Sequence, residues 1–228
     1  MRPLDKHNIY PFEIVEEKIS APRLRPYLQA CEGDSKKAIL LYEWNNSLSA
    51  AIWELIAILE VGIRNTIDTK MSERHLRLGR EGHWIFDVSH ELGSSPNKGL
   101  DSKKPFEEVE QAIARVRRNK KPLVPSQIIS ETSFGFWNQL VSKKQGFLWP
   151  DLASGFPYAP SRDQRYISIL FTDIRDLRNR ISHHHRLQNP AIERGELIIL
   201  EMAKALHPEY CDWLMSVSRV SQIQSQRP

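Results

Sequence analysis

The stretch LSAAIWELIAILEVGI, residues 48–63, decides the fold of this chain. Its large apolar side chains recur at intervals of four, three, one, three and four residues, which places them on one stripe of an amphipathic helix. These side chains are Leu48, Ile52, Leu55, Ile56, Leu59 and Ile63. Asp34 and Ser35 offer capping oxygens upstream, so we expect one long helix that starts near them and ends at about Arg77.

A second apolar seam lies in the last third of the chain. Its members recur at intervals of three, four, three and four residues, a pattern typical of a buried helix face. They are Ile167, Leu170, Ile174, Leu177 and Ile181. Further helices are expected over 106–120, 191–206 and 208–218, whereas strand signals are scarce and no internal repeat is present. We therefore expect a single all-α domain, residues 1–228, built on two long helices.

Three segments of this domain fall outside the long helical patterns. Residues 1–33 predict an N-terminal extension with short extra helices, because Pro22 and Pro26 break any longer one. Residues 79–105 lose their periodicity and contain several glycines, which predicts a long loop. Residues 219–228 are polar and predict a frayed tail.

Composition and charge suit a soluble protein. The formal net charge is +4, which permits nucleic-acid binding without requiring it. Cys31 and Cys211 have no metal-ligand spacing and form no disulfide framework, which is typical of a reducing compartment. The first residues lack an apolar signal core, and Glu54 and Glu60 interrupt the longest apolar stretch, which is short for a bilayer. We expect a cytoplasmic protein without membrane contact.

The second seam ends in LRNRISHHH, residues 177–185, which holds two arginines, an asparagine and three histidines. Arginine stabilises phosphate charge and histidine moves protons near neutral pH, so this cluster indicates chemistry on a phosphodiester. Three adjacent histidines on a helix point in different directions and cannot all reach one ion, which argues against a metal site. Spacing alone does not choose among His183, His184 and His185. These residues also suit a helix C-terminus, where cations interact favourably with the dipole.

The run from Leu177 to His184 resembles the signature of the HEPN superfamily, which is an arginine, a polar residue and, after a short spacer, a histidine. Further segments resemble the Abi-like (abortive infection) family within that superfamily. The matching segments are YEWN at 42–45, LEVGIRN at 59–65, SFGFW at 133–137, Leu148-Trp149 and Phe156-Pro157. The resemblance covers roughly residues 40–218 apart from the 79–105 loop. One departure is His185, because relatives usually carry an acidic residue there.

The resemblance implies an all-α, HEPN-like helical bundle and a metal-independent endoribonuclease that needs no cofactor. Active members usually pair, which implies an RNA substrate and a homodimer. Carried onto this sequence, the catalytic residues are Arg178 and His183, with Asn179 as the intervening polar residue. The RNA 2′-OH would act as nucleophile and His183 as general base or, from the dimer mate, general acid. Arg178 would stabilise the negative charge that develops on the pentavalent phosphate.

Four other residues are candidates to line the cleft beside Arg178. Glu60, Arg64 and Asn65 lie in the motif that the family shares, and His184 follows His183 directly. Glu60 and Arg64 are four residues apart, so an ordinary helix-stabilising ion pair worth about 0.3–0.5 kcal/mol is the simpler interpretation of that pair.

A basic run follows the predicted helix at 106–120. Its members are Arg115, Arg117, Arg118, Lys120 and Lys121. Charge runs are usually solvated helix faces, and this one is the best candidate for contact with an RNA backbone.

Three functions remain open from the sequence. The first is an endoribonuclease that acts as a toxin or an antiphage abortive-infection effector, with an antitoxin as a possible partner. The second is a catalytically silent HEPN module that binds RNA or a protein. The third is a structural protein whose histidines only cap a helix.

Overall fold

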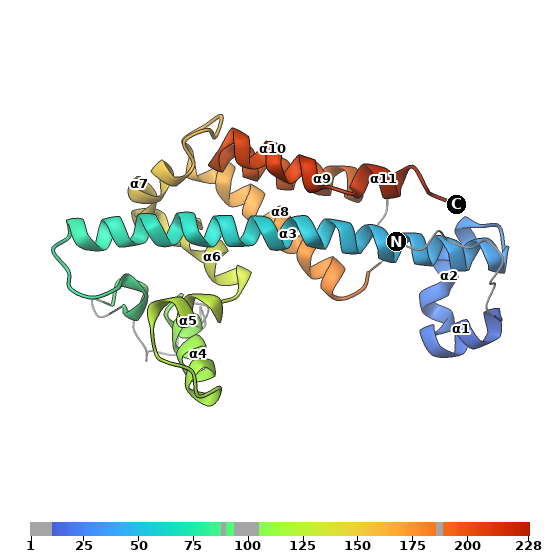
Figure 1. The fold of residues 1–228 in the computed structure, drawn as a ribbon, viewed down its shortest axis with the longest axis horizontal. Helices are drawn as coiled ribbons and strands as arrows, with labels where there is room; N and C mark the ends of the chain where they lie inside the picture. Colours follow the sequence, from blue (N-terminus) through green and yellow to red (C-terminus); the bar gives the residue numbers. More distant parts are fainter. Residues whose placement is uncertain (1–10, 88–89, 94–104, 186–188) are drawn as a thin grey trace.

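A single helix of 43 residues, α3 (Ser35–Arg77), runs along the length of the molecule (Figure 1). The computed structural model describes residues 11–87, 90–93, 105–185 and 189–228, without the side chains of 189–193. Asp34 caps α3, because its carboxylate accepts the backbone N–H groups of Lys36 and Lys37 at 3.0 Å each. The predicted long helix is therefore confirmed, including its start and its end at Arg77.

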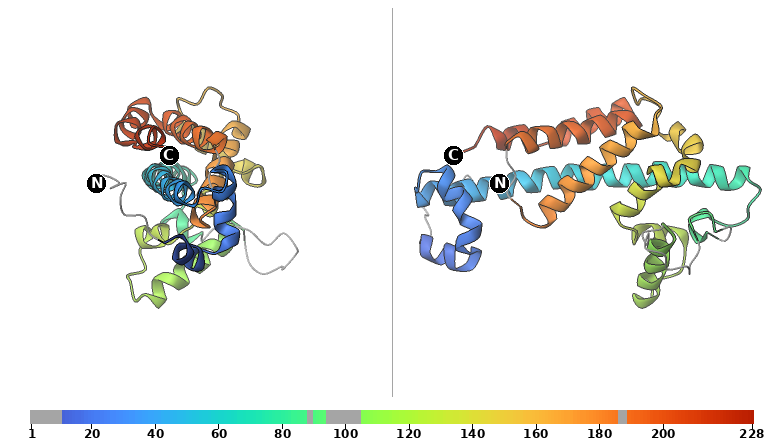
Figure 2. Two further views of the ribbon diagram at one scale, coloured as in Figure 1. Left: turned by 90° about the vertical axis from the view of Figure 1, so that its right-hand side faces the viewer. Right: turned by 180° about the vertical axis from the view of Figure 1, so that it is seen from behind.

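Helices from the C-terminal half cover one side of α3. These are α8 (Gln164–Ser182), α9 (Asn189–Leu206), α10 (Pro208–Val217) and α11 (Val220–Gln224). Figure 2 shows α9 and α11 lying along α3, which α8 also contacts. The apolar seam predicted for α8 is buried in full, as is the stripe predicted for α3. Across the described residues every regular element is a helix, so the expected all-α class is confirmed.

The predicted frayed tail over residues 219–228 is wrong for its first half. Val220 and Ile223 are buried in α11. The indole N–H of Trp44 donates to the backbone oxygen of Ile223 at 2.7 Å, and the Arg227 guanidinium lies 5.5 Å from the Trp44 ring centre. The two apolar side chains of this otherwise polar segment are buried, and its backbone accepts a hydrogen bond from Trp44 of α3. These two interactions order the segment.

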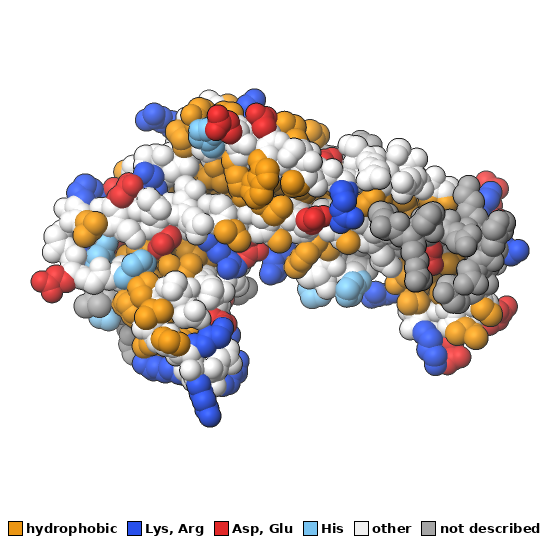
Figure 3. Space-filling model, viewed as in Figure 1, with side chains coloured by type: hydrophobic (Ala, Val, Ile, Leu, Met, Phe, Trp, Pro, Cys, Tyr) orange, Lys and Arg blue, Asp and Glu red, His pale blue; other side chains and the backbone are white. Residues whose placement is uncertain are grey.

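Two lobes project from the other side of α3 near its two ends (Figure 1). The first consists of α1 (Phe12–Ile19) and α2 (Ala21–Ala30), which lie in the predicted N-terminal extension. The second contains α4 (Pro105–Arg118), α5 (Pro125–Ser130) and part of α6 (Phe134–Leu140). Short helical turns then lead to α8: η2 (Lys143–Leu148), α7 (Trp149–Leu152) and η3 (Ala153–Gly155). The surface between the lobes is hollowed, and histidine and basic side chains gather there at the end of α8 (Figure 3).

The loop expected over residues 79–105 contains a packed segment. Trp84 and Ile85 are buried in a single helical turn, η1 (Trp84–Phe86). Glu91 forms ion pairs with Arg74 at 2.5 Å and Arg80 at 2.7 Å, which fasten this segment to the end of α3. The remainder of the expected loop, 88–89 and 94–104, lies outside the described residues.

By length and composition, α3 is suited to cross a membrane. An 18-residue window within it has a mean hydropathy of 1.4 and carries no more than two charged residues, and 39% of that window is buried in the fold. The apolar stretch that the sequence marks as short for a bilayer thus lies within a helix that is long and apolar enough by length and composition. Along its length, α3 packs against α8, α9 and α11.

Candidate functional site

The histidine cluster forms the C-terminal end of α8. His183 is the C-cap residue of α8. The next residue, His184, adopts a left-handed backbone conformation with φ of 55°. The N–H of His184 donates to the oxygen of Ile181, and the N–H of His185 donates to that of Arg180, both at 2.9 Å. This pair of bonds is the Schellman arrangement that commonly terminates helices. The helix end is made by backbone groups, so it leaves the three exposed imidazole rings available for other contacts.

Arg178 is held against α3 by two contacts. Its Nε lies 3.8 Å from Oε2 of Glu60, and its guanidinium carbon lies 5.4 Å from the centre of the Trp53 ring. The contact with Trp53 is a cation–π interaction, which favours a flat, delocalised cation such as guanidinium. About a third of the Arg178 side chain, 32%, remains exposed. The guanidinium is therefore positioned but still accessible.

Glu60 joins two arginines into one cluster. Its carboxylate accepts a hydrogen bond from Nη2 of Arg64, which also donates to the backbone oxygen of Thr132 at 3.2 Å. One carboxylate thus faces two guanidinium groups, which leaves the cluster with a net positive charge. Nε of Arg64 and Nε of Arg178 are both buried without a hydrogen-bond partner among the described residues. The two buried Nε atoms are out of reach of an incoming ligand, so the exposed part of the Arg178 guanidinium is what the net positive charge offers to an anionic group such as a phosphate.

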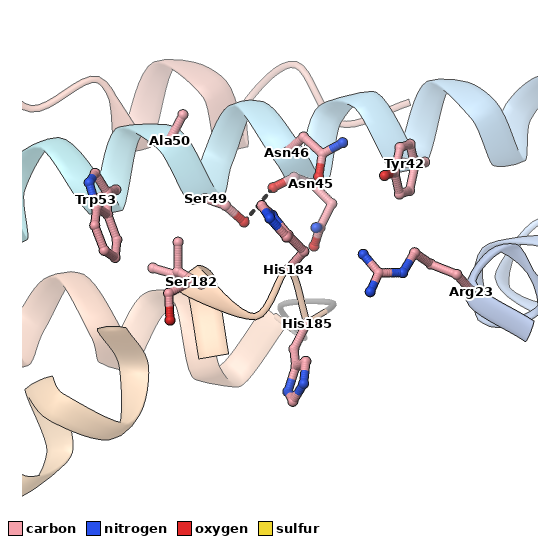
Figure 4. A pocket seen from close by; sticks show the side chains of 11 residues that line it. Arg23, Tyr42, Asn45, Asn46, Ser49, Ala50, Trp53, Ser182, His184 and His185 are labelled. Carbon is pink, nitrogen blue, oxygen red and sulfur yellow. Dashed lines mark hydrogen bonds between the residues drawn. The ribbon is translucent and has the colours of Figure 1, made fainter. Parts of the chain in front are cut away.

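A groove of 780 Å³ opens beside this cluster, between α2, α3 and the end of α8 (Figure 4). Its lining residues are Arg23, Tyr42, Asn45, Asn46, Ser49, Ala50, Trp53, Ile181, Ser182, His184 and His185. A smaller hollow of 400 Å³ shares Arg23, His184 and His185 with it. Trp53 lines the groove and also packs against Arg178, so the groove and the Arg178–Glu60–Arg64 cluster adjoin each other.

The other predicted cleft and catalytic residues differ in their placement. His184 lines the groove, whereas His183 is exposed and its ring centre lies 6.0 Å from that of His185. Asn179 and Asn65 are exposed and do not line the groove. The backbone oxygen of Asn179 accepts the N–H of His183 at 3.0 Å, so its peptide group helps to end the helix.

Arg178 and His183 of one chain leave α8 in different directions. Residues five positions apart are rotated by about 140° on an ideal helix. Arg178 packs against Glu60 and Trp53 of α3, while His183 is exposed at the helix end. Within a single chain, the Arg178 guanidinium and the His183 imidazole therefore do not both face the same phosphate position.

The basic run near α4 divides into two sets. Arg115 donates to the backbone oxygen of Glu131 at 2.7 Å, and Lys121 lies 3.4 Å from the Glu131 carboxylate. The other three members are Arg117, Arg118 and Lys120; they are exposed, and none forms an ion pair within the part of the chain that the structure describes. Figure 3 shows basic side chains gathered at the tip of this lobe.

Several residues of the site were not predicted from the sequence. Trp53 lies seven residues before Glu60, two helical turns away on the same face, so its helical spacing is the one signal that could have found it. Arg23, Asn46 and Ser49 carry no motif. Within the described ranges, no group of three His, Cys, Asp or Glu side chains is arranged to hold a metal ion.

Comparison with models of protein families, with curated proteins and with solved structures finds no match for this chain. The fold and the site define it as an all-α protein in which a long central helix carries a cationic cluster beside exposed histidines. The HEPN and Abi-like resemblance rests on the sequence motifs alone.

Proposed function

We propose that this protein is a metal-independent, HEPN-type endoribonuclease of the Abi-like kind, acting as a toxin or as an antiphage abortive-infection effector. One observation carries the proposal. Arg178 is held by Glu60 and Trp53 yet stays accessible, on the same helix that ends in the exposed His183. A fixed guanidinium and a solvent-accessible imidazole are the two groups that phosphodiester transesterification needs.

The proposed reaction needs only RNA and these side chains. One imidazole removes the proton from the 2′-OH, whose oxygen attacks phosphorus, while the bond from phosphorus to the 5′-oxygen breaks. A second imidazole donates a proton to that leaving oxygen. Arg178 stabilises the extra negative charge on the pentavalent phosphorus. The products are a 2′,3′-cyclic phosphate and a 5′-OH, so DNA, which lacks the 2′-OH, is not a substrate.

We infer that the active form is a homodimer. Arg178 and His183 diverge within one chain, so two copies are needed to face each other and place two such pairs around one phosphate. The exposed Arg117, Arg118 and Lys120 supply phosphate contacts away from the reacting bond. A cytoplasmic location and an antitoxin partner complete the proposal.

The alternative is a catalytically silent HEPN module. The divergence of Arg178 and His183 favours it if the chain stays monomeric, because the basic tip and the groove can still hold RNA without cutting it.

Cleavage of a mixed RNA pool in the presence of EDTA tests the proposal. We compare the wild type with Arg178→Ala and His183→Ala, and with Arg175→Ala, a partly exposed arginine of α8 that pairs with Asp176. We expect cyclic-phosphate products from the wild type and from Arg175→Ala, and a loss of at least about a hundredfold in the other two. Equal cleavage by all four proteins, each checked for folding by circular dichroism, would remove the catalytic assignment. Binding without cleavage would favour the silent module.

A further inference from the structure

The groove between α2, α3 and the end of α8 has the dimensions and lining of a site for a small polar molecule. Its 780 Å³ lies within the range of about 300–1,000 Å³ that ligand sites occupy. Tyr42 and Trp53 supply aromatic surfaces at two positions along α3 (Figure 4). The Tyr42 ring is held by an edge contact with Tyr27, with ring centres 5.3 Å apart. Rings held in this way can stack against a flat heterocycle.

Polar groups along the same stretch of α3 lie between these rings. Asn46 is exposed and offers both a donor and an acceptor through its amide. The hydroxyl of Ser49 donates to the backbone oxygen of Asn45 at 2.8 Å. With its proton engaged, Ser49 presents only acceptor lone pairs to the groove. The groove therefore favours a ligand edge that carries an N–H donor.

Positive charge lies at both ends of the groove. Arg23 extends from α2 into the space near Tyr42 and His185 (Figure 4), and in the described part of the chain its guanidinium forms no ion pair or hydrogen bond. Arg178 lies beyond Trp53 at the other end. A heterocycle in the groove would thus have a cation on each side, as a nucleotide within a strand has a phosphate on each side.

We propose that this groove binds one unpaired nucleobase of the RNA, next to the phosphate at Arg178, and selects bases that carry an exocyclic amino group. Ser49 accepts from that amino group and Asn46 pairs with the neighbouring ring atoms, while Trp53, one turn from Ser49 on α3, stacks on the base. Tyr42, eleven residues from Trp53, lies beside the following nucleotide near Arg23. Arg23 binds the following phosphate. Adenine, guanine and cytosine carry such a group. Uracil has a carbonyl oxygen where cytosine has its amino group, and that oxygen would face the Ser49 lone pairs instead of donating to them. The inference rests on the proposed function, because it assigns a sequence preference to the same site.

Binding of uncleavable single strands tests this assignment. The probes are fluorescein-labelled homopolymers of deoxyadenosine, deoxycytidine and deoxyuridine, which lack the 2′-OH, and the readout is fluorescence anisotropy. We expect the wild type to bind the first two about fivefold or more tightly than the third. The double variant Asn46→Ala/Ser49→Ala should lose this preference, whereas Ser47→Ala, an exposed serine of α3 outside the groove, should keep it.

Arg23→Ala should weaken all three probes and reduce the slope of log Kd against log salt by about one. Its matched control is Arg25→Ala, an exposed arginine of α2 that does not line the groove. Equal affinity for the three probes, tighter binding of deoxyuridine, absence of binding, or a preference that survives in the double variant would each overturn the assignment. An intact preference without RNA cleavage would instead remove the endoribonuclease function and keep the base site.

Discussion

Glu60→Gln is the substitution that tests most directly how Arg178 is held. Glutamine keeps the size of the side chain but removes the negative charge that faces Arg64 and Arg178. Trp53 alone would then position the Arg178 guanidinium. We expect a loss of stability together with a loss of any activity that depends on Arg178.

The size of the effect follows from the geometry. Opposite unit charges 4 Å apart attract by about 4 kcal/mol at an effective dielectric constant of about 20. Nε of Arg178 lies 3.8 Å from the Glu60 carboxylate, but the arginine is 32% exposed, so solvent screens much of this attraction. Glu60 is only 13% exposed and serves two arginines, so its replacement leaves two positive charges unopposed. We expect the free energy of unfolding to fall by about 2 kcal/mol, less than the roughly 3–5 kcal/mol for a fully buried pair.

Urea unfolding followed by circular dichroism measures this difference. The matched control is Glu54→Gln, because Glu54 pairs with Arg219 at 2.8 Å on the same helix but is 46% exposed. That control should lose less than about 1 kcal/mol. For a chain of this length, 2 kcal/mol corresponds to a fall in Tm of about 4–8 °C. Equal losses in the two variants, or full stability of Glu60→Gln, would refute the claim that Glu60 positions the cluster.

Three further expectations concern the fold around the site. Gly62→Ala should destabilise the protein by about 1–2 kcal/mol in urea unfolding despite a better helix propensity, because its Cβ would lie 2.6 Å from the hydroxyl of Tyr210. His184→Gly should be more stable than His184→Ala by about 1 kcal/mol in the same assay, because this residue has φ of 55°. Burial raises the pKa of Glu91, but hydrogen bonds from Arg74 and Arg80 outweigh it and lower the pKa overall. Stability from that carboxylate is present above its unfolded pKa and is lost below about pH 4, so Glu91→Gln should reduce the loss of Tm on acidification.

Each of these expectations has a clear contrary result. A more stable Gly62→Ala protein would show that Tyr210 moves aside at no cost. A His184→Ala protein as stable as His184→Gly would show that the left-handed backbone is not strained. An unchanged slope of Tm against pH in Glu91→Gln would show that its ion pairs contribute nothing to acid sensitivity.

The helices were predictable because their signals are local. The stripe from Leu48 to Ile63 repeats with the helical period. Asp34 caps the helix by accepting the N–H groups of residues two and three positions further along the chain. Both features therefore act within a few turns. The same logic predicted the buried seam of α8, from Ile167 to Ile181. Prediction failed where burial by a distant element decides the outcome. Ile223 belongs to a polar segment that reads as a tail, but its burial against α3 and the hydrogen bond from Trp44 order it as part of α11.

What the sequence by itself determined was the set of helices and the presence of an arginine and histidines at the end of one of them. Packing alone decided which groups meet. Glu60 and Arg178 come together because α8 crosses α3, and the groove exists because α2 folds back beside the end of α8. Gly62 carries no turn signal in the sequence. The need for a glycine there is evident only in the tertiary structure, where Tyr210 of α10 packs directly against it. Contacts of this kind join residues far apart in the chain, so no local periodicity encodes them, whereas helical spacing is set within each turn.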